Sequence, residues 1–288
     1  MTRMARRRRE RAGLVAGCIA LAASLVALVG VLPAYAHTWQ DYYRYGTYTS
    51  RWDVGEIRWH FDTNYWNQGT AFRDRAREAT AVWSGVLSNG YVQFKEMDTL
   101  GSGTYEQCSY NARVNYLRHA QLTGPAAVTW YCYRPAPNGD EWSVTGFAIT
   151  LDSEPAFGDG TPATWYSGTG TGGSTQVDLL SALTHEFGHA GGHAVHFDEP
   201  ALCPTVASAD HSSAPTMCAG VWYGNDTNRR TLEDHDVHTM QAAYATPPPA
   251  PTTTTTAPSG GIGTRPRCDV YASGPTLASV SPFLPRCV

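Results

Sequence analysis

The sequence predicts an α+β domain, in which helices cover a β-sheet. Much of the chain consists of short segments with the composition of strands, bounded by Gly, Pro and Asn. Two longer segments instead repeat apolar residues every three or four positions, as amphipathic helices do. Both patterns fall within residues 51–245, which is an ordinary length for one domain.

The predicted elements follow one another from residue 56. Glu56–Phe61 alternates polar and apolar residues like a half-buried strand. A helix is expected over 70–87, with Phe72, Ala76, Ala79, Val82, Trp83 and Val86 on its apolar face. Further strands are expected at Tyr91–Phe94, Arg113–Leu117, Ala126–Tyr133 and Val144–Leu151. The first half is therefore a sheet with one covering helix.

A second helix is predicted to begin near Thr175. Thr175-Gln-Val-Asp178 approximates a capping box, which satisfies free backbone N–H groups of the first turn. The apolar side of this helix carries Val177, Leu180, Leu183 and Phe187. His185 and His189 lie one turn apart on a neighbouring face. Glycines after His189 favour the end of the helix.

The N-terminus has the layout of an export signal. Residues 1–36 place a run of arginines before the apolar stretch Leu14–Leu32 and end in Ala34-Tyr35-Ala36. We expect a signal peptide over 1–36 and a secreted mature chain that starts at His37. Two alternatives stay open, because the apolar stretch approaches the length of a membrane anchor and Val15–Cys18 resembles a lipoprotein cleavage box.

The mature chain is acidic. Without residues 1–36 it has 15 basic and 24 acidic residues, a formal net charge of −9, and Lys95 is its only lysine. Such a chain is a poor ligand for a phosphate backbone. We expect no nucleic-acid partner, no membrane partner after cleavage of the signal, and a monomer.

The flanks of the domain differ from it in composition. Residues 37–50 are rich in Tyr and are expected to form an N-terminal strap packed on the domain. Residues 246–264 read as a Pro/Thr/Gly linker without apolar periodicity. Residues 265–288 form a tail that is too short for a core of its own and is expected to be closed by a disulfide.

Six cysteines remain in the mature chain. In an exported protein an even number indicates disulfides, here three. They fall into sequence-local pairs, and we predict that these pairs form: Cys108 with Cys132, Cys203 with Cys218, and Cys268 with Cys287.

The segment Thr184–His189 contains the pattern HExxH. Two imidazoles at i and i+4 of a helix, here His185 and His189, can bind one metal ion from the same face, and Glu186 points toward the metal-bound water. Zinc lowers the pKa of that water, and a nearby carboxylate takes its proton. The pattern predicts a catalytic zinc site; a helix whose histidines bind nothing is the alternative.

HEFGHAGG followed by His196 resembles the signature of the metzincin metalloproteases, and of their matrixin subgroup in particular. Pro215-Thr216-Met217 is similar to the Met-turn of that family, and Thr231–Tyr244 to its final helix. The resemblance covers about Arg51 to Tyr244. It implies a metzincin-like zincin fold: a twisted mixed sheet, an active-site helix and a smaller C-terminal subdomain. It also implies that Met217 supports the metal from below without binding it, although an ordinary core methionine is the alternative.

The third zinc ligand departs from the family pattern. With Gly192 aligned to the family glycine, the expected position is Val195, and valine cannot bind metal. His196 lies one residue later, and a loop leaving the helix at Gly191-Gly192 can absorb the extra residue. His193 and Asp198 are the alternatives. We predict that His185, His189 and His196 hold one Zn²⁺ ion.

The resemblance implies a zinc-dependent endopeptidase, in which Glu186 assists attack of a zinc-bound water on a peptide bond. Its protein or peptide substrate would lie extended along an edge strand, expected at Val144–Leu151. A catalytically inactive cell-surface binding protein with the same fold is the alternative. His211, His235 and His238 are expected to be surface or structural residues. Trp222 and Tyr223 are expected either to line the specificity pocket or to be core.

Overall fold

A computed structural model shows an α+β fold, as the sequence predicts, with a mixed sheet and three α-helices among the described residues. The structure describes residues 44–45, 48–63, 68–87, 92–99, 115–122, 124–135, 141–157, 160–193, 196–197, 203, 214–218, 227–244 and 267–273. The predicted signal peptide and linker lie outside these residues. No helix in the described part of the chain is long and apolar enough to cross a membrane.

The elements lie close to the positions that the sequence predicts. The main sheet contains β1 (Arg44–Tyr45), β2 (Tyr48–Arg51), β3 (Glu56–Phe61), β4 (Gln93–Glu96), β5 (Asn115–Ala120), β6 (Ala127–Pro135), β7 (Glu141–Asp152) and β10 (Arg267–Ser273). A small separate sheet pairs β8 (Thr164–Tyr166) with β9 (Gln176–Asp178). The helices are α3 (Thr70–Ser84), α4 (Leu179–Gly191), the 3₁₀ turn η3 (Asn228–Arg230) and α5 (Asp234–Ala243).

In the main sheet the strands follow the order β10-β6-β7-β5-β3-β4, and β2 runs beside the first residues of β7. β2, β3, β4 and β5 are parallel to β7, whereas β6 is antiparallel to it. β7 therefore has neighbours on both sides, and the expectation that Val144–Leu151 is an edge is wrong. Only residues 136–140 separate β6 from β7, a hairpin-like length, so β6 folds back and covers that edge.

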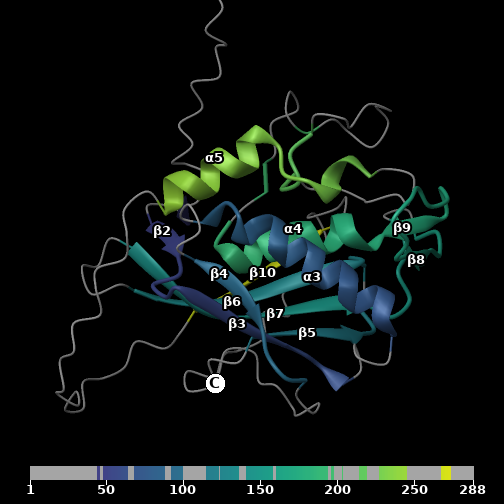
Figure 1. The fold of residues 1–288 in the computed structure, drawn as a ribbon, viewed down its shortest axis with the longest axis horizontal. Coiled ribbons are helices and arrows are strands. Elements are labelled where there is room, and N and C mark those ends of the chain that lie inside the picture. The colour runs from purple at the N-terminus through teal and green to yellow at the C-terminus, as the bar shows by residue number, and fades with distance from the viewer. Residues whose placement is uncertain are drawn as a thin grey trace, which may run out of the picture. The chain divides into compact units, whose positions relative to one another are not determined.

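The three helices lie on the same side of this sheet (Figure 1). α3 and α4 pack side by side on the sheet, and α5 lies farther from it, beyond α4. Every residue of α4 from Leu179 to Gly191 is buried. The segment that carries HExxH is thus the central helix of the fold, with protein on all sides.

Phe187 anchors α4 to the sheet. Its ring makes edge-to-face contacts with Trp59 of β3, Phe94 of β4 and Phe147 of β7, at centroid distances of 5.3, 5.2 and 6.1 Å. Aromatic pairs of this geometry add to the free energy gained by burying their area. Because Phe187 follows Glu186 directly, this packing also fixes the rotation of the helix turn that holds the HExxH side chains.

The C-terminal end of α4 is closed by residues from both ends of the domain. The indole Nε1 of Trp52 donates to the Ala190 carbonyl at 2.7 Å, and the Tyr244 hydroxyl donates to the Gly191 carbonyl at 2.6 Å. The Trp52 amide in turn donates to the Tyr244 oxygen at 3.1 Å. These bonds satisfy carbonyls that a helix end would otherwise leave without a partner.

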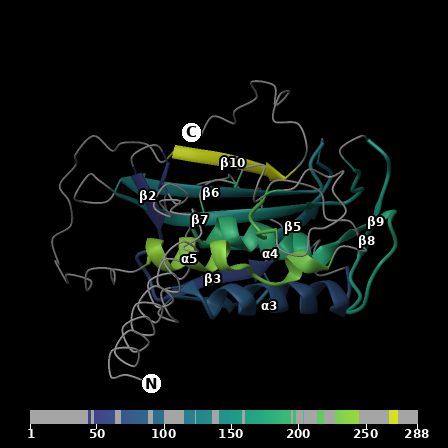
Figure 2. The ribbon, with the colours of Figure 1, turned by 90° about the horizontal axis from the view of Figure 1, so that it is seen from above.

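The tail adds a strand to the main sheet, whereas its predicted closure by a disulfide lies partly outside the described residues. Its strand β10 pairs antiparallel with β6 and lies along the outer side of that strand (Figure 2). Cys132 of β6 is disulfide-bonded, and the register places the Cα of Cys268 opposite it. The partners predicted for these two cysteines, Cys108 and Cys287, lie outside the described residues.

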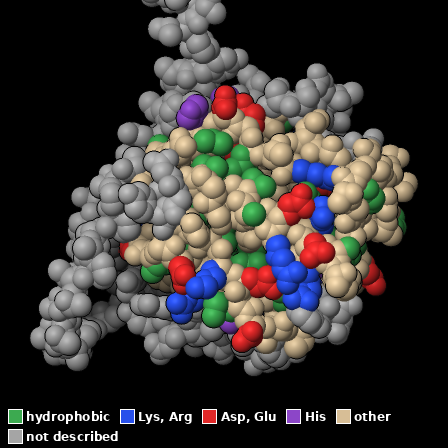
Figure 3. Space-filling view, viewed as in Figure 1, with side chains coloured by type: hydrophobic (Ala, Val, Ile, Leu, Met, Phe, Trp, Pro, Cys, Tyr) green, Lys and Arg blue, Asp and Glu red, His purple; other side chains and the backbone are tan. Residues whose placement is uncertain are grey.

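Charged side chains of both signs lie close together on the face shown in Figure 3. Arg77 of α3 donates to Glu96 of β4 at 2.7 Å, and Lys95 of β4 lies 2.8 Å from Glu56 of β3. These pairs lie at the surface, where solvent screens them, so each contributes little to stability. As a result, these basic side chains of α3 and β4 lie beside acidic ones.

Candidate metal centre

The start of α4 is fixed by Asp178, three residues after Thr175, the cap that the sequence predicts. Asp178 is the N-cap and accepts a hydrogen bond from the Ser181 amide at 2.8 Å. The expected cap, Thr175, lies ahead of β9, because Gln176–Asp178 pairs with β8 in place of starting the helix. Arg230 of η3 donates to the buried Asp178 carboxylate at 2.5 Å. The helix therefore starts at a carboxylate held by a charged partner from the C-terminal half.

The helix ends at a glycine, as predicted. Gly192 is the C-cap with φ 115°, in the left-handed region that favours glycine, and its amide donates to the His189 carbonyl at 2.9 Å. The chain turns sharply at this point and leaves the helix axis. This turn brings His196 back toward α4.

Three histidine rings point their Nε2 atoms toward one another. The Nε2 atoms of His185 and His196 are 2.9 Å apart, and the Nε2 atom of His189 lies 3.1 Å from each of them. Nitrogen ligands at about 2.05 Å around a tetrahedral ion would be separated by roughly 3.3 Å. The observed triangle is close to one face of such a tetrahedron.

The other ring nitrogens orient two of these rings. His185 Nδ1 lies 2.7 Å from the Thr216 carbonyl, and His189 Nδ1 lies 2.7 Å from the His193 carbonyl. A carbonyl only accepts, so each Nδ1 carries the hydrogen and each Nε2 presents a lone pair. Lone pairs that point at one centre repel each other unless a cation lies between them. The donor set therefore fits a metal ion, and Zn²⁺ takes such nitrogen ligands.

The electrostatic setting keeps these rings neutral. Burial, followed by the repulsion of neighbouring imidazoles, lowers the pKa of His185 and of His189 well below the ordinary 6.5. Burial and then the positive charge of Arg229 lower the pKa of His196 to about 4. Neutral imidazole is the form that binds metal, so the three rings are ready as ligands at neutral pH.

Glu186 is held beside this triangle by the sheet. It is fully buried, and its Oε2 accepts a hydrogen bond of 2.6 Å from the Thr129 hydroxyl of β6. It follows His185 directly and lies at i, i+3 to His189, a spacing that places side chains on the same side of a helix. Sequence reasoning identified Glu186 but missed Thr129, because no local pattern shows which strand faces α4.

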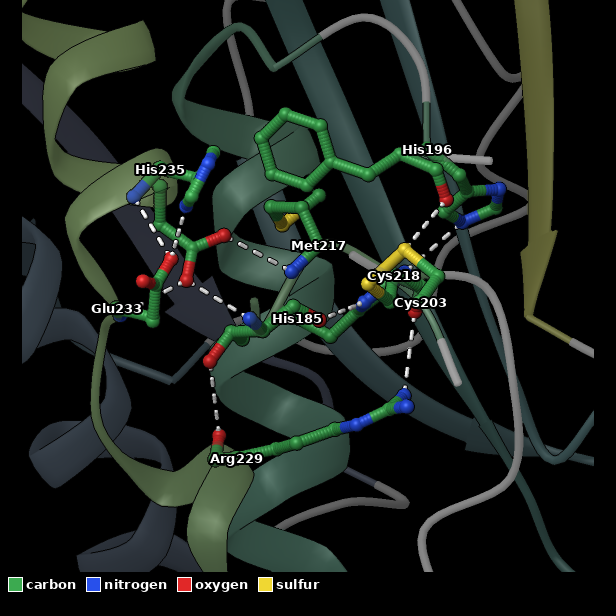
Figure 4. Close-up of a disulfide and its surroundings, with 11 residues drawn as sticks. His185, His196, Cys203, Met217, Cys218, Arg229, Glu233 and His235 are labelled. Atoms are coloured by element: carbon green, nitrogen blue, oxygen red, sulfur yellow. Dashed lines mark hydrogen bonds and ion pairs between the residues drawn. A yellow bond between two sulfur atoms is a disulfide. The ribbon is translucent and has the colours of Figure 1, made fainter. Parts of the chain in front are cut away.

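Met217 lies beneath the helix in a turn fixed by Asp236. Its sulfur packs on Gly188, the residue before His189, and the side chain is fully buried. The Asp236 carboxylate of α5 accepts hydrogen bonds from the amides of Thr216 at 2.7 Å and Met217 at 3.0 Å (Figure 4). The same turn supplies the Thr216 carbonyl that orients His185. One carboxylate thus fixes both the methionine and a histidine ring.

The predicted disulfide between Cys203 and Cys218 forms, and it lies close to the site (Figure 4). Cys218 follows Met217, and its carbonyl accepts a hydrogen bond of 3.2 Å from the buried Arg229. Phe197, the neighbour of His196, pairs with Cys218 in an isolated bridge. The disulfide therefore ties together the loop that supplies His196 and the turn that carries Met217.

The remaining predicted residues lie elsewhere or outside the described part. His193 is buried but absent from the cluster: its ring packs on Phe197 at 5.0 Å, and its carbonyl orients His189. His235 lies 2.7 Å from Glu233, and His238 is exposed on α5. Five other residues named in the sequence analysis lie outside the described part of the chain: Val195, Asp198, His211, Trp222 and Tyr223.

No protein-family model matches this chain, and a search of curated proteins finds no match. The assignment of the site therefore depends on its geometry and on the residues that form it.

Proposed function

We propose that this protein is a secreted zinc endopeptidase of the metzincin type. His185, His189 and His196 hold one Zn²⁺ ion, and Glu186 is the general base. The observation that carries the proposal is the meeting of three Nε2 atoms within 3.1 Å of one another, beside a buried carboxylate. The Cys203–Cys218 disulfide supports an extracellular location, because such bonds persist in oxidising compartments.

The roles of the residues follow from their chemistry. Zinc, when bound, activates water and polarises the carbonyl of the scissile bond. Glu186 takes a proton from the attacking water and later delivers it to the leaving amine. Thr216 and His193 keep two ligand rings in the tautomer that binds metal, through their carbonyls. Met217 packs beneath α4 and takes no part in proton transfer.

Retention of Glu186 supports an enzyme over an inactive binding protein. A module that only binds has no chemical need for a buried carboxylate next to a metal ligand, and burying one is costly. The Thr129 hydroxyl offsets part of that cost.

The test is replacement of Glu186 by Gln in the full chain. We expect the Glu186→Gln variant to keep its fold and about one zinc per chain while turnover of an unfolded protein substrate falls by about a hundredfold or more. A chelator should abolish the parent activity, and added zinc should restore it. An active, metal-free parent or an unaffected Glu186→Gln variant would contradict the proposal.

A further inference from the structure

The strand next to the candidate metal centre has its outer side occupied by the protein's own tail. β6 pairs with β7 on one side and with β10 on the other. The pairing with β10 runs without a shift from Arg267 opposite Tyr133 to Ser273 opposite Ala127. An extended peptide that adds to this sheet at β6 needs the same backbone groups that β10 uses.

β10 passes the site at the level of the proposed general base. Thr129 of β6 contacts Glu186, and the register places Tyr271 of β10 opposite Thr129. Neighbouring strands are separated by about 4.8 Å. The backbone of β10 therefore follows the path that an extended substrate would take past Glu186.

We propose that β10 is an internal blocking strand, which occupies the substrate-binding edge of β6 and lowers the activity of the full chain until it is displaced. The proposal rests on the peptidase function proposed above. The occupant is a segment of the same chain, Arg267–Ser273, bound by strand addition in the manner of a peptide substrate.

The link between tail and domain favours this occupant over a free peptide. Residues 245–266 join Tyr244 to Arg267, and most of them are Pro, Thr, Ala and Gly. A covalent tether of this length and composition gives the attached segment an effective concentration on the order of millimolar. A substrate at micromolar concentration cannot displace it unless it binds far more tightly.

The backbone register also favours a covalent tether. Residues directly opposite each other in an antiparallel pair have Cα atoms about 4.5–5.5 Å apart, which is within the range that a disulfide spans. Cys132 is disulfide-bonded, and Cys268 is opposite it in the register. We therefore pair Cys132 with Cys268 in place of Cys108, and peptide mapping of a non-reduced digest identifies the pair.

The test releases β10 in the full chain. Alternate amides of an antiparallel strand point to its partner, so of Asp269 and Val270 one donates toward β6 and the other points away. Proline removes that donor. Two variants, each with Cys268→Ser, carry Asp269→Pro or Val270→Pro, and the matched control carries Cys268→Ser with Thr254→Pro in the linker.

Amide hydrogen exchange shows whether β10 has left β6, and peptidase activity shows whether its departure frees the site. In one of the two strand variants, we expect faster amide hydrogen exchange in β6 and a gain of about tenfold or more in kcat/KM on a short peptide, with unchanged zinc content. The linker control should show neither change. Unchanged amide exchange in both strand variants would overturn the proposal of a blocking strand. Where the parent shows turnover, faster exchange without a gain in activity would overturn it as well.

Failure of the proposed function gives a different result. If parent and variants all lack turnover, the peptidase proposal fails, and the strand is judged by binding of a fluorescent extended peptide. Tighter binding by the released variant than by the control then supports the blocking strand, and equal binding overturns it.

A second and independent observation concerns Thr129. Its hydroxyl is completely buried and lies 2.6 Å from Glu186 Oε2 and 3.1 Å from the Glu186 backbone oxygen. A hydroxyl has one hydrogen to donate, and the shorter contact is the one to the carboxylate. Because Thr129 belongs to the sheet and Glu186 to α4, this bond fixes the carboxylate relative to the strand along which substrate would lie.

We infer that Thr129 is a positioning residue for Glu186; this role also rests on the proposed function. Thr129→Val keeps the shape and removes the hydroxyl, whereas Thr129→Ser keeps the hydroxyl. We expect Thr129→Val to lower kcat about tenfold to a hundredfold, as for loss of a hydrogen bond to a charged group, with KM and zinc content nearly unchanged. Thr129→Ser should recover most of kcat.

The matched control is Thr150→Val, at a fully buried threonine of β7 whose hydroxyl accepts a hydrogen bond from Arg118. Equal kcat in Thr129→Val and the parent overturns the role. Equal losses in Thr129→Val and Thr129→Ser that follow their loss of stability also overturn it. If the variants that release β10 also show no turnover, the role of Thr129 and the peptidase function are both overturned.

Discussion

The Asp236 carboxylate bonds to the backbone amide of Met217 at 3.0 Å and thereby connects the last helix to the turn beneath α4. A second bond, to the Thr216 amide at 2.7 Å, and a third, to the Glu233 amide at 3.0 Å, use its other oxygen. All three donors are backbone groups, so only a side chain with two acceptor oxygens can serve them. The side chain is fully buried, which makes this carboxylate a structural support of the site.

Replacing Asp236 by Asn should therefore weaken the site without touching a metal ligand. The amide keeps one acceptor oxygen and turns an NH₂ group toward at least one backbone N–H. We expect a loss of about 1–3 kcal/mol in the free energy of unfolding and weaker zinc binding. Denaturant unfolding and a zinc competition titration measure the two effects. Asp234→Asn, at an exposed position of the same helix turn, is the control and should change stability by under about 0.5 kcal/mol.

Gly188 is required because there is no room for a side chain between α3 and α4. A Cβ at this position would overlap Met217 and lie 2.7 Å from the ring of Trp83. We expect Gly188→Ala to destabilise the protein by about 1–3 kcal/mol, although alanine is the better helix former. Gly85→Ala is the matched control, because Gly85 has φ −70° and its Cβ would meet only backbone oxygens at 3.7 Å or more. A Gly188→Ala variant as stable as Gly85→Ala would contradict this packing argument.

The third ligand can be identified by side-by-side zinc affinities. His196→Ala should lose zinc affinity by a hundredfold or more, comparable to His185→Ala, because it removes one of three nitrogen ligands. His193→Ala keeps the backbone carbonyl that orients His189 and should lose far less. His238→Ala, at an exposed position, is the control. Asp198→Ala is included because the sequence alone leaves it open, and a larger loss there than in His196→Ala would reverse the assignment.

The metal-free protein should lose stability as the pH falls below 6.5. The pKa values of His185, His189 and His196 are lowered on folding, so the unfolded chain takes up protons first between pH 6.5 and about 4. Asp236 acts in the opposite direction, because burial raises its pKa from 3.8 to about 6 and the folded state takes up that proton first. Three histidines outweigh one carboxylate. Thermal unfolding between pH 7.5 and 4.5 in a chelator should show a falling midpoint; a constant or rising one would contradict this balance.

Local sequence patterns predicted the helices, most strands and three residues of the site. HExxH has a fixed geometry once its segment is helical, so His185, Glu186 and His189 needed no tertiary information. The start of α4 was misplaced, because Asp178 and Thr175 are both good caps and the pairing of β9 with β8 decided between them. That pairing is a tertiary contact, which no local pattern contains.

The strand order and its consequences could not be predicted. Nothing in Val144–Leu151 indicates that an earlier strand pairs on each of its sides, so the prediction that it is an edge strand was wrong. β10 shows this more strongly, because a segment beyond a long linker joins β6 across more than a hundred residues of sequence. Thr129 could not be predicted for the same reason, because its role depends on which strand faces Glu186.

The closure of α4 by Trp52 and Tyr244 has a consequence for how the protein matures. The two residues are 192 positions apart, yet each donates to a carbonyl at the end of the same helix. During synthesis the helix end therefore lacks part of its closure until the last turn of α5 has been made. Contacts of such high sequence separation slow folding. The end of the helix that carries HExxH is thus completed only when nearly the whole domain is available to fold.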